Sequence, residues 1–176
     1  MSIVWQFCNI DVLFLSSQLL YFLHMATQTR HRKLPRTPIL IIENNPDQWL
    51  IIRSVLAQCF PHVAPIWKQH APDVLAYLDS TGNKKLSRPQ LIIVEPNLPA
   101  QEDGWALIKQ IKAQPAYQDI PVIILSHSEK AQDIAYAYGF GIAAYITRPT
   151  TVQQWLACFT ALRRHWGEVV HLPNPL

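Results

Sequence analysis

Five short apolar runs alternate with amphipathic segments from residue 38 to residue 166, and this alternation restricts the fold more than any other feature of the sequence. The runs are PILIIE (38–43), VAPIW (63–67), QLIIVE (90–95), PVIILS (121–126) and IAAYI (142–146). Three of them are rich in isoleucine and valine without polar alternation, which is typical of parallel strands covered by helices on both faces. The pattern predicts a five-stranded parallel sheet in a three-layer, doubly wound α/β domain.

Helical spacing separates the predicted strands. Asn45 is a favourable N-cap and Pro46 suits the first helical position, so the first helix is expected from Pro46 to about Phe60. Further helices are expected over 72–80, from near Asp103, over 130–138 and from near Thr150. In the last of these, the spacing of four apolar residues predicts one buried face, formed by Trp155, Phe159, Leu162 and Trp166.

The charge balance argues against a nucleic-acid function. Residues 1–36 hold four of the 15 basic residues and one of the 12 acidic residues, so residues 37–176 carry 11 of each sign. A neutral domain lacks the positive field that drives contact with phosphate backbones. Cys8, Cys59 and Cys158 are widely spaced and odd in number, which indicates neither a disulfide framework nor a zinc site and favours a reducing, cytoplasmic location.

The N-terminal extension, residues 1–36, contains an apolar stretch at 12–26 followed by the basic run RHRK. A membrane-spanning helix needs about 20 predominantly apolar residues, and this stretch is shorter and interrupted by polar side chains, which disfavours membrane insertion. Three alternatives stay open for it: translated upstream sequence before a true start at Met25, an amphipathic docking helix, or an anchor.

Polar residues stand where four of the predicted strands end. They are Glu43 and Asn44, Glu95, Ser126, and the triplet Thr147-Arg148-Pro149. Because the carboxyl ends of parallel strands meet at one edge of a doubly wound sheet, and ligands bind at that edge, we predict a functional site there.

From residue 38 to about residue 165 the sequence resembles the receiver domains of two-component response regulators, which are flavodoxin-like. ILIIENNPDQ resembles their first strand with its acidic pair, LIIVEPNLP the phosphoacceptor strand and loop, PVIILS the strand that ends in a hydroxyl residue, and YITRP the aromatic-x-x-Lys-Pro ending. The NLP and WGEVVHLP segments are similar to stand-alone regulators associated with bacterial phytochromes. We therefore expect a receiver-like domain over 37–166 and a tail over 167–176 that is too short for a DNA-binding output domain.

The resemblance implies transfer of a phosphoryl group from a kinase histidine to an aspartate beside a Mg²⁺ held by carboxylates. Three positions depart from that pattern. Glu95 stands at the acceptor position with a longer stem, and Asn44 replaces the second acid, so a metal would retain only Glu43 and Glu95 and bind weakly. Arg148 stands at the lysine position, where its planar guanidinium is suited to pairing with Glu95.

Two switch positions implied by the resemblance are retained, the hydroxyl of Ser126 and the aromatic ring of Tyr145. The changed acceptor and retained switch favour a pseudo-receiver that acts by protein–protein interaction rather than as an enzyme. Its sequence leaves open whether Glu95 opposite a cation mimics the phosphorylated state or marks an inactive site kept for packing. The alternative function is a receiver that still accepts phosphate with unusual site residues.

The expected partners are a histidine kinase or another signalling protein, with a homodimer possible through residues 130–166. Tyr136, Tyr138 and Trp155 are anchors of that surface if exposed and ordinary packing if not. An FMN cofactor is disfavoured because the loop after the first strand lacks a run of small or hydroxyl residues to hold a phosphate. A Ser126-His127 hydrolase is disfavoured because neighbours in a strand point to opposite faces.

Overall fold

The computed structural model describes residues 36–81, 87–98 and 101–169. The predicted N-terminal extension up to residue 35 and the tail from residue 170 lie outside the described residues. In chain order the elements are β1 (Thr37–Ile42), α2 (Pro46–Cys59), β2 (Val63–Lys68), α3 (Ala71–Thr81), β3 (Leu91–Val94), α4 (Gln101–Ala113), β4 (Val122–Ser126), α5 (Ala131–Tyr138), β5 (Ala144–Thr147) and α6 (Val152–Val169).

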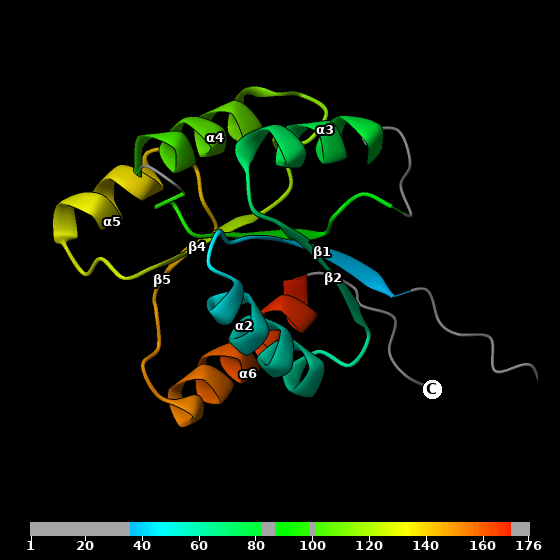
Figure 1. The fold of residues 1–176 in the computed structure, drawn as a ribbon, viewed down its shortest axis with the longest axis vertical. Helices are drawn as coiled ribbons and strands as arrows, with labels where there is room; N and C mark the ends of the chain where they lie inside the picture. Colours follow the sequence, from blue (N-terminus) through cyan, green and yellow to red (C-terminus); the bar gives the residue numbers. More distant parts are fainter. Residues whose placement is uncertain (1–35, 82–86, 99–100, 170–176) are drawn as a thin grey trace, which may run out of the picture. The chain divides into compact units, whose positions relative to one another are not determined.

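The five strands form one sheet in the order β2-β1-β3-β4-β5, and every neighbouring pair is parallel. Helices α3, α4 and α5 lie on one side of this sheet, and α2 and α6 lie on the other (Figure 1). The predicted three-layer, doubly wound arrangement is therefore confirmed. The order reverses direction at β1 and β3, which places the switch point of the sheet between these two central strands.

The two faces of the sheet bury separate hydrophobic clusters. Leu40 and Ile42 of β1 point into the cluster under α3, α4 and α5, whereas Ile39 and Ile41 point into the cluster under α2 and α6. Successive side chains of a strand alternate between its faces, so a central strand covered on both sides needs apolar residues at every position. This requirement explains the uninterrupted isoleucine and valine runs of the sequence.

Capping residues set the starts of helices α2 and α6. Asn45 caps α2 as predicted, because its side chain accepts hydrogen bonds from the backbone N–H groups of Asp47 and Gln48. Helix α6 starts at Val152, slightly after the predicted start near Thr150. The start is set by a capping box formed by Thr151 and Gln154. The Thr151 hydroxyl accepts from the backbone N–H of Gln154, and the side-chain Oε1 of Gln154 accepts from the backbone N–H of Thr151.

Strand β2 is one edge of the sheet and carries a proline. The bonds from Thr37 N to His62 O and from Glu43 N to Lys68 O show that the even-numbered residues of β2 face β1. Pro65 therefore faces the open edge, where its missing N–H breaks no ladder bond. The N–H of Val63 faces the same way and is already used by Phe60 O.

The predicted apolar face of the last helix is confirmed for its first two positions, since Trp155 and Phe159 are 4% and 1% exposed. Leu162 packs against the same cluster, and the side chain of Trp166 lies outside the described part. Across the helices that the structure describes, none is both long enough and apolar enough to cross a membrane.

Candidate functional site

The carboxyl ends of four strands bring together the polar residues that the sequence singled out. Glu43 follows β1, Glu95 follows β3, Ser126 ends β4 and Arg148 follows β5. These four side chains are among the few buried polar ones in the described residues, exposing 2%, 5%, 2% and 5% of their surface. A charged group is rarely buried to this degree unless it is paired, so the contacts among Glu43, Glu95 and Arg148 define the site.

One nitrogen of Arg148 joins the two acids. Nη2 donates to Glu43 Oε2 at 2.7 Å and to Glu95 Oε2 at 2.8 Å, which are distances typical of charge-assisted hydrogen bonds. The predicted pairing with Glu95 thus occurs, but through one shared nitrogen rather than through a two-pronged fork on one carboxylate. Two buried negative charges share one buried positive charge, which leaves the trio with a formal charge of −1.

Further hydrogen bonds fix the orientation of the trio, although the buried Arg148 Nε has no partner among the described residues. Arg148 Nη1 donates to Gln48 Oε1 at 2.8 Å, and Nη2 also reaches the Leu125 carbonyl at 3.3 Å. The second oxygen of each acid accepts a backbone N–H, from Asn45 at 2.9 Å in Glu43 and from Asn97 at 3.0 Å in Glu95. Every carboxylate oxygen of the trio therefore has a hydrogen-bond donor.

Asn44 lies beside this trio and is half-buried. Its Nδ2 donates to the backbone carbonyl of Asn97 at 3.4 Å, in the loop that follows β3. Receiver-type sites imply a Mg²⁺ at this edge, and Mg²⁺ requires oxygen ligands with free lone pairs. As arranged, these residues do not fit an ion shared by the two acids, because Arg148 Nη2 lies between Glu43 Oε2 and Glu95 Oε2 at 2.7 and 2.8 Å.

The two predicted switch residues belong to a second set of contacts, on the loop between β4 and α5. Ser126 Oγ accepts from Ser128 N at 3.2 Å, and the half-buried Tyr145 donates its hydroxyl to Ser128 O at 2.8 Å. The Ser128 hydroxyl in turn donates to Asp133 Oδ2 at 2.5 Å in the first turn of α5. Tyr145 therefore ties β5 to the start of α5 through this loop.

Two contributors to the site were not predicted from the sequence. Gln48 reaches the guanidinium from the first turn of α2, and Trp67 on β2 donates its indole Nε1–H to the Glu43 carbonyl at 2.7 Å. Trp67 also stacks on Trp49 of α2, with ring centroids 5.3 Å apart and planes inclined by 10°. The one signal for Gln48 in the sequence was its position, as a polar residue three places after the N-cap Asn45.

A glycine allows α4 to approach the loop that carries Glu95. A Cβ on Gly104 would lie 1.8 Å from the Pro96 carbonyl oxygen, so no larger residue fits there without a shift of the backbone. Pro96 and Leu98 are themselves buried, and Asn97 between them donates its backbone N–H to Glu95. This close contact fixes the loop after β3.

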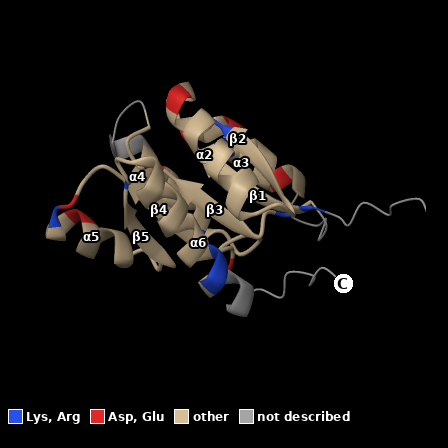
Figure 2. Ribbon diagram, turned by 90° about the horizontal axis from the view of Figure 1, so that it is seen from below, with Lys and Arg blue, Asp and Glu red and all other residues tan. Residues whose placement is uncertain are grey.

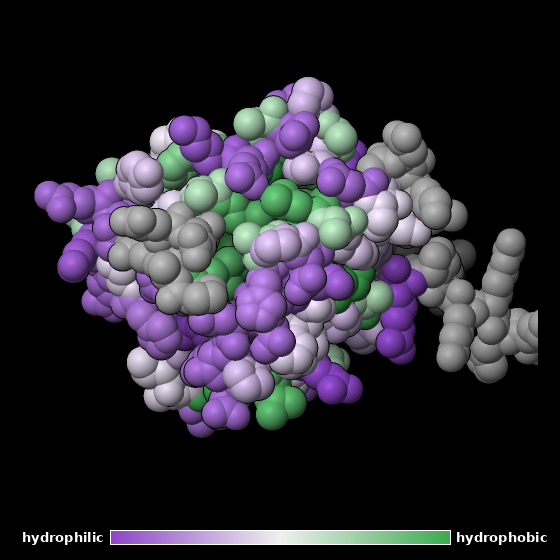
Figure 3. Space-filling model, turned by 45° about the horizontal axis from the view of Figure 1, so that its top comes forward, coloured by the Kyte–Doolittle hydropathy of each residue, from purple (hydrophilic) through white to green (hydrophobic). Residues whose placement is uncertain are grey.

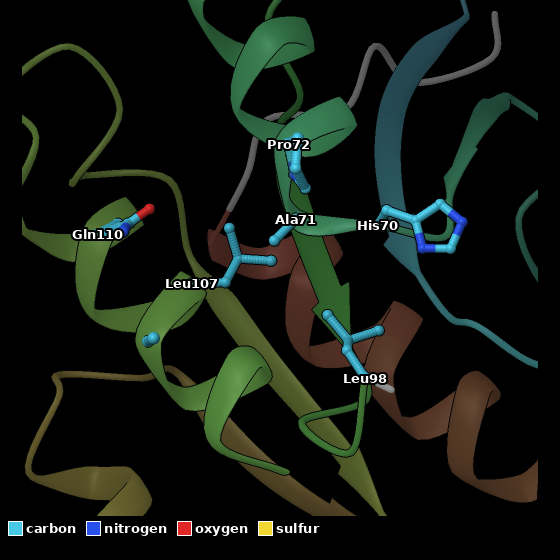
Figure 4. A pocket seen from close by; sticks show the side chains of 7 residues that line it. His70, Ala71, Pro72, Leu98, Leu107 and Gln110 are labelled. Atoms are coloured by element: carbon cyan, nitrogen blue, oxygen red, sulfur yellow. The ribbon is translucent and has the colours of Figure 1, made fainter. Parts of the chain in front are cut away.

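A hollow of about 390 Å³ lies between the start of α3 and the middle of α4, and Leu98 of the loop after β3 also lines it. On this face, which Figure 3 brings forward, apolar residues reach the surface near its middle. Leu98, Leu107 and Ala71 converge on the hollow, whereas the His70 ring points away from these three side chains (Figure 4). Among the residues that the structure describes there, its lining is mainly apolar and includes no Asp, Glu, Lys or Arg.

The expected partner surface, residues 130–166, contains both exposed and buried aromatic residues. Tyr136 and Tyr138 of α5 are 56% and 52% exposed, whereas Trp155 is buried in the core. Tyr136 also packs edge-on against Trp105 of α4 and Phe140. Of the three predicted anchors, two are therefore available at the surface and Trp155 is ordinary packing. Charged residues of both signs are scattered over the described ribbon (Figure 2).

A parallel sheet whose carboxyl edge gathers two acids, a hydroxyl and a cation defines the class of receiver-type signalling domains. The chain belongs to this class by sequence as well: the family model of the response regulator receiver domain matches residues 39–159, so the protein is a member of the response regulator receiver family of two-component signalling.

Its relatives include phytochrome-associated regulators, in agreement with the resemblance of its sequence. Response regulator Rcp1 of Synechocystis sp. is 26% identical over 140 residues, which cover 79% of this chain and 94% of that protein. The crystal structure of the phosphorylated cyanobacterial phytochrome response regulator RcpA matches with a TM-score of 0.67 and 27% identity, over 79% of this chain and 99% of that one. The Mn²⁺-bound form of Rcp1 matches with a TM-score of 0.65 and 26% identity, over 78% and 99%.

Proposed function

We propose that this chain is a pseudo-receiver, which signals in a two-component pathway by binding another protein and does so without being phosphorylated. The observation that carries the proposal is the position of Arg148 Nη2, which donates to both Glu43 Oε2 and Glu95 Oε2. The residue at the acceptor position is thereby held in a buried ion pair.

The pairing opposes phosphoryl transfer to Glu95. Glu95 Oε2 accepts from the guanidinium while Oε1 accepts from Asn97 N, so these two contacts fix the orientation of the carboxylate. Turning Oε2 toward a phosphorus atom would separate it from its buried charged partner, which costs several kcal/mol. Glu95 thus acts as a structural anion rather than as a nucleophile.

The switch contacts support a domain held in one state. Tyr145 is engaged by the Ser128 carbonyl, and Ser128 by Asp133 of α5. The surface beside them carries the exposed rings of Tyr136 and Tyr138, so we assign partner binding to α5, β5 and α6, with a kinase, another signalling protein or a second copy of the chain as the occupant. A cytoplasmic location is part of this proposal.

Phosphorylation of the purified protein tests the proposal directly. The wild-type chain and the triple variant Asn44→Asp/Glu95→Asp/Arg148→Lys, which restores the family pattern, are incubated with acetyl phosphate and Mg²⁺ and weighed by intact mass spectrometry. We expect no added phosphoryl group on the wild type. A stoichiometric phosphoryl group on wild-type Glu95 would contradict the proposal and favour the alternative, a receiver that is still phosphorylated.

Binding supplies the second readout. The affinity of the wild-type chain for the dimerisation and histidine-bearing domain of a candidate kinase is measured with and without acetyl phosphate. The proposal predicts equal dissociation constants in the two conditions. An affinity that changes by more than about tenfold on adding the donor, equivalent to 1.4 kcal/mol, would show that phosphorylation controls binding.

A further inference from the structure

The guanidinium of Arg148, which Glu43 and Glu95 share, lies where a metal ion would be expected. In receiver-type sites a divalent ion draws the acids of the first and third strands together, and here a guanidinium nitrogen lies between those same two carboxylates. We propose that Arg148, assisted by the amide of Asn44, takes the structural place of the divalent cation, so that this chain assembles its site without Mg²⁺ and excludes the ion while Arg148 is in position. The inference rests on the site of the proposed function and extends it from phosphate to metal.

The distances leave no room for both cations. Mg²⁺ binds oxygens at about 2.0–2.1 Å. An ion that bound Glu43 Oε2 and Glu95 Oε2 together would have to occupy the volume of Arg148 Nη2, which lies 2.7 and 2.8 Å from these two atoms. Two like charges at such a separation also repel each other strongly in a buried site.

Asn44 removes a further set of ligands. An aspartate at this position would add a third carboxylate, whereas Asn44 is neutral and directs its Nδ2–H₂ at the Asn97 carbonyl. That carbonyl, in the loop after β3, thereby accepts a hydrogen bond from a neutral amide. Asn44 thus links the loop after β1 to the loop after β3, as a shared metal ion would.

Other contacts hold Arg148 in this position. Its Nη1 binds Gln48 at the start of α2, its Nη2 also approaches Leu125 O, and its backbone N–H donates to Ser126 O at 2.7 Å. The loops after β1, β3 and β5 are therefore joined through one side chain. A metal ion must first break these buried hydrogen bonds, so we expect its affinity to be lower by at least about a hundredfold than in a site without Arg148.

Trp67 provides a reporter for the test. Its indole N–H donates to the Glu43 carbonyl, so movement of Glu43 toward a metal alters the environment of the ring. The full chain is titrated with Mg²⁺ and, separately, with Mn²⁺, following tryptophan fluorescence and the heat of binding. The same titrations are made on Asn44→Asp/Arg148→Lys and on Asn44→Asp, which adds the acid but keeps Arg148.

The expected result is saturable binding in Asn44→Asp/Arg148→Lys and none in the wild type or in Asn44→Asp over the same concentrations. Saturable binding of Mg²⁺ or Mn²⁺ at the wild-type site would overturn the inference, and this measurement holds even if a variant does not fold. A folded double variant that binds neither ion would also overturn it, because Arg148 and Asn44 would not be the cause of exclusion. A wild-type chain that binds Mg²⁺ yet is not phosphorylated contradicts this inference alone and leaves the proposed function standing.

Discussion

Arg148 donates to Glu95 at 2.8 Å in a pair whose side chains expose only 2% and 5% of their surface. Such a pair differs from a surface salt bridge because neither charge is compensated by water if its partner is lost. The same guanidinium also serves Glu43, so the loss of one cation would leave two uncompensated acids.

Replacing Arg148 with glutamine should therefore destabilise the protein by about 3–5 kcal/mol, the usual cost of breaking a buried ion pair from one side. Chemical unfolding of both proteins at neutral pH measures the difference. Arg88→Gln is the matched control, because Arg88 pairs with an Asp119 side chain that is 69% exposed, and such exposed pairs contribute about 0–1 kcal/mol. Equal losses in the two variants would mean that the buried trio contributes no more than a surface pair.

Removing the Tyr145 hydroxyl should loosen the loop between β4 and α5. Tyr145→Phe deletes the donor to Ser128 O while keeping the ring, so the expected loss is about 0.5–1.5 kcal/mol. Tyr138→Phe, at a tyrosine that is 52% exposed, should change stability little. Amide hydrogen exchange of residues 127–133 gives the local readout, and unchanged protection there in Tyr145→Phe would refute the proposed tie.

The approach of α4 to the loop after β3 predicts intolerance at Gly104. Gly104→Ala places a methyl group where the Pro96 carbonyl oxygen lies, and such overpacking costs about 1–3 kcal/mol despite the better helix propensity of alanine. Thermal and urea unfolding measure it against Lys109→Ala, an exposed position on the same helix that should stay within about 0.5 kcal/mol. A stabilised Gly104→Ala would show that the loop yields without cost.

Acid should weaken the contact between Arg88 and Asp119. The hydrogen bond from Arg88 holds the pKa of the Asp119 carboxyl below its ordinary value of 3.8. A carboxyl with a lowered folded pKa contributes stability above that ordinary value and loses it as the pH falls through the folded pKa. The stability difference between wild type and Asp119→Asn should thus be present at neutral pH, at no more than about 1 kcal/mol for so exposed a pair, and vanish in stronger acid.

Urea unfolding at low salt over a pH series from neutral to below about pH 3 measures this difference. In an Arg88→Gln background the pH-dependent effect of substituting Asp119 should be smaller, because the Arg88 hydrogen bond is the largest cause of the lowered pKa and Lys112 is a lesser one. An undiminished difference there would assign the effect to partners other than Arg88.

The strands were predictable because each lies in a short apolar run that alternates with segments of helical spacing. The meeting of Glu43, Glu95 and Arg148 was also predictable, since it follows from strand ends that share one edge of a parallel sheet. The exact bounds were less accessible: β5 begins at Ala144 rather than Ile142, and α4 begins at Gln101 rather than near Asp103. Such ends depend on tertiary contacts as well as on local preference.

The hydrogen-bond partners of individual side chains could not be predicted from the sequence. Nothing in the spacing shows that Arg148 would use one nitrogen for two acids, or that Gln48 would hold its other nitrogen, because both depend on distances between separate loops. The same holds for Tyr136 and Trp155, both aromatic and both on helices, of which one is exposed and the other buried. Their difference is set by what packs against each helix.

Pro65 on the outer edge of β2 has a consequence for how copies of this protein meet one another in a crowded solution. An incoming strand needs a continuous row of N–H and C=O groups. This edge has no N–H at Pro65, and the N–H of Val63 already donates to the Phe60 carbonyl. Polymerisation by strand addition is therefore discouraged on this side of the sheet. A signalling domain can thus reach high local concentration while this edge stays out of aggregates.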